Sequence, residues 1–308
     1  MTLPDRICDP HHHLWDIVSS RYVLSSLLED LTTVPQVKST IFVECDAWYR
    51  PTGPEHLRSV GETEWVANCA TDIITGIVAQ TDLRLGSLTE ESLDAHRDAA
   101  GDRLRGIRQR ATWDPSHLIK DLPPHAGPQL LLDPRFRDGF SLLAQRGLTF
   151  DAWVYFPQLL DIVDLAQTFP ETKIILNHLG GPIVLGPYLD RQVVLTQWRS
   201  LMSQVAKCPN VVLKIGGIGM PLYGQQWHKQ DSQPTSQEVA VAWGEPIRWC
   251  IETFEPSRCM FESNFPVDRF SLDYVTVWAT FDLISSDYSQ SERDDLFCNT
   301  ALKTYQLN

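Results

Sequence analysis

The chain has 308 residues, of which 43% are hydrophobic and 21% charged, a composition typical of a globular protein that can bury a large core. Its formal net charge of −13 at pH 7 argues against nucleic acid or an anionic membrane as a partner, because both bind basic surfaces. The seven cysteines form no C-x-x-C pair, which predicts reduced thiols and a cytoplasmic protein. There is no signal-peptide pattern and no apolar stretch near 18 residues, so no membrane span is predicted.

Eight short apolar runs recur along the chain, each rich in β-branched or aromatic residues and flanked by breakers such as Pro, Gly or Asn. They are residues 7–13, 39–45, 73–81, 104–110, 148–154, 173–178, 210–216 and 259–264. Most intervals between them can hold a crossover helix, and residues 157–167 and 198–206 show the apolar spacing of amphipathic helices.

Alternating strands and helices predict a parallel sheet. Eight such units predict closure into a (β/α)8 TIM barrel, with residues 1–308 as one α/β domain. An open doubly wound sheet is the alternative, and it is disfavoured because no glycine-rich phosphate turn follows the first run.

Two long insertions follow predicted strands. Residues 48–61 come after the second run and are rich in Pro, Gly and aromatic residues, and residues 219–235 come after the seventh. The loops that follow barrel strands gather at the C-terminal face, so we expect both insertions to lie there as long loops around a binding pocket. Trp48 is a candidate for substrate binding.

Histidines gather at the end of the first run. Side chains alternate along a strand, so His11 and His13 share one face while His12 points the other way. Two imidazoles side by side suit zinc or a similar divalent ion, although a cluster without function is the alternative. His178 ends the sixth run before two glycines, and a third imidazole on the same rim favours the functional interpretation.

Four short motifs of the chain resemble those of a known protein family. They are D-x-H-x-H-x-W-D at residues 9–16, R-G-I-R at 105–108, L-x-H-L-G-x-P at 176–182 and S-N-F-P at 263–266. Together they resemble the amidohydrolase-related family, and within it a group of metal-dependent TIM-barrel hydrolases that contains dicarboxypyrone lactonase and sugar lactonases. The similarity runs from residue 7 to residue 305.

This resemblance implies hydrolysis of a lactone, cyclic ester or amide, although some relatives decarboxylate aromatic acids. It also implies a divalent metal, with zinc as the expected ion, and it assigns His11, His13 and His178 as metal ligands. His178 is equally a candidate for catalysis.

One position departs from the family pattern. The family usually has an aspartate where this chain has Asn264, and an amide cannot act as a general base. The departure lowers the charge of the site and its expected affinity for metal, so catalysis without metal is an alternative. Besides His178, the candidates for the missing base are Glu262, on the same strand face as Asn264, and Glu44, at the end of the second run.

Each carboxylate also has a structural interpretation. Glu262 can form a buried salt bridge with Lys214 on the neighbouring strand, and Glu44 can be a hydrogen-bonding carboxylate inside the barrel. Asp268, just past the last strand, is expected to be an ordinary loop charge.

Two arginines share a face at the end of the fourth run. Arg108 is expected to hold a substrate carboxylate in a bidentate pair, which predicts an anionic small-molecule substrate. Arg110 is expected to pair with an acidic residue of the protein. Trp153 and Tyr155 end the fifth run and are candidates for lining the pocket, with core packing as the alternative.

The sequence therefore predicts an enzyme that opens a lactone, cyclic ester or related amide by attack of water at a histidine-rich site. A decarboxylase on the same barrel is one alternative, and a barrel that has lost catalysis and only binds ligand is another. The sequence leaves the substrate open, and also the oligomeric state, a homodimer included.

Overall fold

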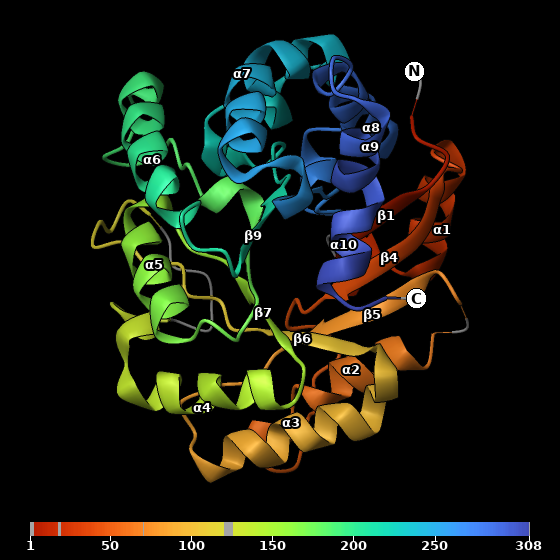
Figure 1. Ribbon diagram of the computed structural model, residues 1–308. Coiled ribbons are helices and arrows are strands. Elements are labelled where there is room, and N and C mark those ends of the chain that lie inside the picture. The colour runs from red at the N-terminus through yellow and green to blue at the C-terminus, as the bar shows by residue number, and fades with distance from the viewer. Residues whose placement is uncertain (1–2, 18–19, 70, 120–125, 308) are drawn as a thin grey trace.

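The computed structural model describes residues 3–17, 20–69, 71–119 and 126–307. Eight parallel strands form one sheet in chain order and curl into a nearly closed barrel (Figure 1). The strands are β1 (Ile7–His12), β4 (Val37–Val43), β5 (Ile74–Ala79), β6 (Leu104–Arg108), β7 (Thr149–Ala152), β8 (Ile174–Leu176), β9 (Val211–Ile215) and β10 (Cys259–Phe261). Each lies within or overlaps one of the eight apolar runs, so the predicted (β/α)8 barrel is confirmed.

Helices surround the strands in an outer ring, except that α10 (Thr300–Thr304) packs against β1 and β10 at one end of the barrel (Figure 1). They are α1 (Leu24–Thr33), α2 (Val60–Ala67), α3 (Ser87–Ala100), α4 (Pro134–Gln145), α5 (Leu159–Thr168), α6 (Arg191–Val205), α7 (Ser236–Phe254), α8 (Tyr274–Ile284), α9 (Gln290–Asp294) and α10 (Thr300–Thr304). The helices predicted at 157–167 and 198–206 are α5 and the second half of α6. Within the part of the chain that the structure describes, no helix is long and apolar enough to cross a membrane.

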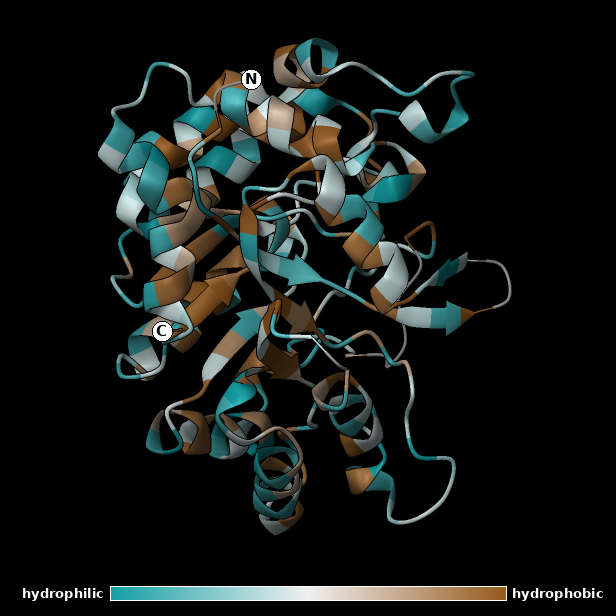
Figure 2. Ribbon diagram, turned by 90° about the vertical axis from the view of Figure 1, so that its right-hand side faces the viewer, coloured by the Kyte–Doolittle hydropathy of each residue, from teal (hydrophilic) through white to brown (hydrophobic). Residues whose placement is uncertain are grey.

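The strands are buried on both faces, which explains why they read as continuous apolar runs. In β8, Ile174 and Leu176 belong to the apolar layer between strands and helices, while Ile175 points into the barrel. The interior layer around Ile175 is closed from below by Cys298 and Tyr305, from the segment that contains α10. In Figure 2 the central strands are mainly brown, whereas the surrounding helices carry much teal.

The barrel closes where β1 meets β10, and regular pairing is sparse there. The backbone N–H of Asn264 donates to the His11 carbonyl at 3.0 Å, and the backbone N–H of His13 donates to the Phe265 carbonyl at 2.7 Å. The buried Asp9 carboxylate replaces the missing ladder, since it accepts hydrogen bonds from the Ser263 backbone N–H at 3.0 Å and the Tyr274 hydroxyl at 2.9 Å. A side chain thus joins the two ends of the sheet.

The structure differs from the sequence prediction in two respects that matter for the site. A two-stranded antiparallel hairpin, β2 (Trp15–Ile17) and β3 (Ser20–Tyr22), follows β1 and was not predicted. In addition, β7 and β8 end before the apolar runs do. The chain leaves the ladder at these points, and His178 takes a φ of +52° at the start of a short 3-10 helix.

Candidate functional site

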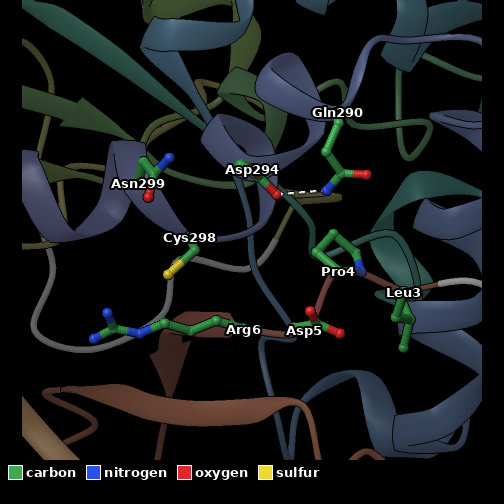
Figure 3. Close-up of a pocket in the computed structure, with 8 residues that line it drawn as sticks. All are labelled: Leu3, Pro4, Asp5, Arg6, Gln290, Asp294, Cys298 and Asn299. Carbon is green, nitrogen blue, oxygen red and sulfur yellow. Dashed lines mark hydrogen bonds between the residues drawn. The ribbon is translucent and has the colours of Figure 1, made fainter.

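A cavity of about 230 Å³ opens at the C-terminal ends of the barrel strands. It is lined by His13, Trp15, Cys45, Arg108, Arg110, Trp153, His178, Met220, Pro221, Leu222, Asn264 and Val267. A larger cavity of about 490 Å³ lies at the opposite end, beside the residues that precede β1 (Figure 3). Its lining contains none of the predicted site residues, so we place the chemistry at the smaller cavity, where barrel enzymes carry their active sites.

His11 and His13 lie together as predicted, with their Nε2 atoms 3.2 Å apart. The Nδ1–H of His13 donates to the Val43 carbonyl at 2.7 Å, because a carbonyl can only accept. Nε2 of neutral His13 therefore carries a lone pair that faces His11. His12 points away as expected and contacts the Thr40 hydroxyl at 3.0 Å.

Glu262 lies beneath the histidines and serves two of them. One carboxylate oxygen is 2.7 Å from Nδ1 of His178, and the other is 2.7 Å from Nδ1 of His11. The contact with His178 is a hydrogen bond, and since a carboxylate is an acceptor it places the His178 proton on Nδ1. The contact with His11 has a short distance without hydrogen-bond geometry. Nε2 of His178 is therefore available in a residue that lines the cavity.

The salt bridge considered for Glu262 and Lys214 is replaced by another one. The fully buried Lys214 ammonium lies 2.7 Å from Asp151 and 3.4 Å from Nδ1 of His11. Asp151 also accepts both a hydrogen bond from Asn177 at 3.0 Å and one from the Tyr305 hydroxyl at 2.9 Å. Asp151 was not predicted from the sequence, although a charged residue inside an apolar run was the available signal.

Arg108 uses its guanidinium fork on the protein itself. Its Nε donates to the Glu44 carboxylate at 2.7 Å, and its Nη2 donates to the Glu44 carbonyl. Only Nη1 remains on the side of the histidines, 3.4 Å from Nε2 of His11. Arg108 was expected to bind a substrate carboxylate through two donors. In the structure, Glu44 occupies two of these donors. Arg110 pairs with Asp46 and approaches Glu44 at 3.6 Å, as predicted for an internal ion pair.

Asn264 lines the cavity and pairs with Asp268. The Asn264 amide donates to one oxygen of Asp268 at 2.8 Å, and the Gly219 N–H donates to the other at 2.9 Å. Asp268 is fully buried, so the expectation of an ordinary loop charge was wrong. Burial raises the pKa of Asp268 to about 8. An amide can meet either form of this carboxyl group, because it carries both a donor and an acceptor.

Aromatic side chains stand beside two of the histidines. The Trp153 ring meets His178 edge-on with centroids 4.7 Å apart, and the Trp15 ring stacks near His13 at 6.0 Å. Trp15 comes from the hairpin that the sequence did not reveal. Tyr155 is buried and packs against Trp153 at 5.9 Å, and Trp48 stacks on Trp65 at 4.3 Å.

The lining residues test the placement of both predicted loops and of the three aromatic candidates, of which Trp153 lines the cavity. Residues 219–235 contribute Met220, Pro221 and Leu222 to the cavity wall, so this loop does lie at the mouth. The wall includes neither Tyr155 nor Trp48, nor any other residue of 48–61.

His11 and His13 are held neutral by their surroundings. Burial lowers the pKa of His11 well below its usual value, and the neighbouring Lys214 ammonium lowers it further. Burial also lowers the pKa of His13, with the Arg108 guanidinium as a second cause. Neutral imidazoles keep the lone pairs that a metal ion or a proton requires.

The donor set fits a divalent metal. Potential ligand atoms of His11, His178 and Glu262 all lie within 4.8 Å of one another. Two nitrogens bound to one tetrahedral zinc lie about 3.3 Å apart, close to the 3.2 Å between Nε2 of His11 and Nε2 of His13. His11 and His13 also have acceptors at Nδ1, the arrangement that orients metal-binding imidazoles.

Comparison with known proteins places the chain in a family. A family model described as amidohydrolase matches residues 8–307. An uncharacterized protein, y4mH, from Sinorhizobium fredii is 31% identical over 325 residues, which cover 98% of each chain. An L-fucono-1,5-lactonase from Burkholderia multivorans is 26% identical, over 80% of this chain and 77% of that protein.

Solved structures share the barrel. An amidohydrolase from Burkholderia multivorans, solved with bound zinc, has a TM-score of 0.76 at 22% identity, covering 98% of this chain and 100% of that one. A 5-carboxyvanillate decarboxylase from Sphingomonas paucimobilis has a TM-score of 0.60 at 12% identity, covering 99% and 100%. At these identities the likeness shows the fold alone, and this fold is compatible with hydrolysis and with decarboxylation.

The motif-based resemblance is confirmed by the family match over nearly the whole chain and by the barrel that carries the histidines at its mouth. The chain belongs to the amidohydrolase family and is an enzyme.

Proposed function

We propose that this enzyme opens a lactone ring by hydrolysis at the cavity lined by His13 and His178. The observation that carries the proposal is the shared carboxylate of Glu262, which fixes Nδ1 of His178 at 2.7 Å and leaves Nε2 for the cavity. A carboxylate behind an imidazole holds the tautomer that can take a proton and stabilises the imidazolium that results. The lactonase among the relatives of the chain supports the same reaction class.

In the proposed reaction, Nε2 of His178 accepts a proton from the attacking water as the water oxygen bonds to the lactone carbonyl carbon. The ring C–O bond then breaks, and His178 returns the proton to the departing ring oxygen, so the product is a hydroxy acid. Asn264 cannot take a proton and serves as a polar contact to the water or the carbonyl. Nη1 of Arg108 lies 3.4 Å from Nε2 of His11, on the side of the histidines where the lactone carbonyl would bind. From there it would stabilise the negative charge that develops on the carbonyl oxygen.

His11 and His13 would hold a divalent metal, and we propose zinc. When bound, zinc would supply a Lewis acid beside the carbonyl. Glu262 and the Val43 carbonyl would orient the two imidazoles through their Nδ1 atoms. This arrangement reserves His178 for proton transfer.

The test is a pH-indicator screen of lactones with the purified protein, with and without chelator, because ring opening releases a proton. His178→Ala should lower kcat at least about 100-fold, since the proton acceptor is lost. His228→Ala is the matched control, because His228 lies in the loop of residues 219–235 but is not part of the cavity wall. Near-normal turnover of His178→Ala would contradict the proposal, and loss of activity with chelator would support zinc.

A decarboxylase would give a different product. It would release carbon dioxide from a carboxylate substrate without attack by water, and a coupled carbon dioxide assay on aromatic acids measures this directly. Carbon dioxide release with no ring opening in the lactone screen would favour decarboxylation over our proposal.

A further inference from the structure

We infer that the substrate is an uncharged and largely apolar cyclic ester, rather than a polyhydroxylated sugar lactone or a lactone with carboxylate groups. This inference rests on the proposed lactone hydrolysis and adds the class of ring. It follows from how the polar groups around the cavity are used and from what covers the rest of the wall.

The cations at the cavity are already compensated. The Arg108 guanidinium pairs with Glu44 at 2.7 Å, and Arg110 pairs with Asp46. Two positive side chains therefore face two negative ones, and the fork that could grasp a carboxylate is closed by Glu44. An anionic ring would have to enter a cavity whose two guanidinium groups already face the negative charges of Glu44 and Asp46.

Most other polar groups of the wall are also satisfied by the protein. Nδ1 of His13 is bonded to a backbone carbonyl at 2.7 Å, and Nδ1 of His178 to Glu262 at 2.7 Å. The Cys45 thiol donates to the Leu14 carbonyl at 3.3 Å, and burial raises the pKa of this thiol well above its usual value. The Asn264 amide is bonded to Asp268 at 2.8 Å on one side.

Few atoms are left for a ligand, and most of them have a task in the reaction. They are Nε2 of His13, Nε2 of His178, one atom of the Asn264 amide and Nη1 of Arg108, together with Nη1 of Arg110 and the Trp153 indole N–H. Nε2 of His13 is assigned to the metal, and the atoms of His178, Asn264 and Arg108 are required by the water and the ester carbonyl. Only the donors of Arg110 and Trp153 remain for other groups of the ring. A sugar lactone carries several further hydroxyl groups, and each one buried without a partner weakens binding about 5- to 150-fold.

The remainder of the wall is apolar. It consists of Trp15, Trp153, Met220, Pro221, Leu222 and Val267. The two indoles flank His13 and His178 directly, at centroid distances of 6.0 and 4.7 Å. A flat or alkyl-substituted ring can pack on these surfaces while its ester carbonyl meets the histidines. The cavity of about 230 Å³ also sets a small size for such a ring.

The experiment compares kcat/KM of the wild-type enzyme for three lactones: dihydrocoumarin, which is uncharged and apolar, L-fucono-1,5-lactone and 2-pyrone-4,6-dicarboxylate. We expect dihydrocoumarin to be preferred at least about 10-fold over each of the others. Equal or higher kcat/KM for either polar lactone would overturn the inference.

A variant pair then tests the wall itself. Leu222→Asn places a hydrogen-bonding side chain in the apolar wall and should reduce the preference for dihydrocoumarin over the sugar lactone at least about 5-fold. Leu189→Asn makes the same change on an exposed side chain outside the cavity and should leave the preference unchanged. Thermal melting of both variants confirms folding, and an unchanged preference in a folded Leu222→Asn would count against the inference.

A binding measurement separates this inference from the proposed function. Lactams of the apolar and sugar rings, which are much more resistant to hydrolysis than lactones, can be titrated by isothermal calorimetry. Tighter binding of the apolar lactam by an enzyme that hydrolyses none of the three lactones would refute the proposed function and support the ring class. Tighter binding of the sugar lactam would refute the ring class, whatever the enzyme hydrolyses.

Discussion

The Glu262 carboxylate holds two imidazoles at once, with one oxygen 2.7 Å from Nδ1 of His11 and the other 2.7 Å from Nδ1 of His178. From the sequence, Glu262 is expected to act as a base or to form a salt bridge with Lys214. The structure shows a third arrangement, in which Asp151 neutralises Lys214 and Glu262 is free to orient the histidines. Such an arrangement depends on distances between three strands, which no spacing along the chain encodes.

Glu262→Gln tests this orienting role. An amide is neutral and has one acceptor atom, so it can no longer present a charged acceptor to Nδ1 of His178 and a second oxygen to His11. We expect kcat to fall about 10- to 100-fold, which is the usual effect of losing a carboxylate behind a functional histidine. Steady-state kinetics measures it, with the exposed pair residue Glu245→Gln as the control. A Glu262→Gln enzyme with unchanged kcat would refute the orienting role.

At the scale of elements, the position of each strand could be predicted but its end could not. The apolar runs at 148–154 and 173–178 continue past the last ladder hydrogen bonds of β7 and β8, because the residues beyond remain buried in the loops of the mouth. Burial, and not strand pairing, makes these segments apolar. The hairpin of β2 and β3 escaped prediction because two strands of three residues carry too little alternation.

The junction at which β1 meets β10, called the seam below, allows a prediction about stability. Asp9→Asn should lower the free energy of unfolding by about 1–3 kcal/mol, because the buried carboxylate that accepts from Ser263 and Tyr274 is replaced by a group with one acceptor. Tyr274→Phe removes one of these donors and should cost about 1 kcal/mol. Urea unfolding measures both changes.

Asp5→Asn is the matched control, since Asp5 is exposed and lies four positions before Asp9. It should change the unfolding free energy by less than about 0.5 kcal/mol. Equal effects of Asp5→Asn and Asp9→Asn would show that the seam does not depend on this side chain.

At the scale of the whole molecule, buried carboxyl groups determine how stability responds to pH. Burial raises the pKa of Glu62 to about 8 and that of Asp268 to about 8, whereas both ionise near pH 4 in the unfolded chain. Between pH 7 and 8.5 the folded state therefore holds protons that the unfolded state has lost. The free energy of unfolding therefore decreases as pH rises through this range, because unfolding releases these protons.

We thus expect the free energy of unfolding to be lower at pH 8.5 than at pH 7, as measured by urea unfolding at each pH. Histidines compensate only slightly, because His12 and His96, with pKa values lowered by burial to about 3 and about 4, are neutral in the folded state, and histidines of the unfolded chain are already mostly neutral above pH 7. The double variant Glu62→Gln and Asp268→Asn should flatten the decline. A wild-type stability that rises over the same interval would contradict the assignment.

The sequence by itself determined the strand order, the eight-fold repetition and the polar residues at the strand ends, among them His13, His178 and Asn264, because apolar periodicity and the position of a polar residue at a strand end are local properties. It did not determine which aromatic residues line the cavity, since Trp15 does and Trp48 and Tyr155 do not. Only the tertiary structure decided what those residues contact. It engaged Arg108 with Glu44, buried Asp268 against Asn264, and set Glu262 between His11 and His178. Each of these pairs joins strands or loops far apart in the chain or fixes a side-chain direction, and such contacts arise only when the barrel closes.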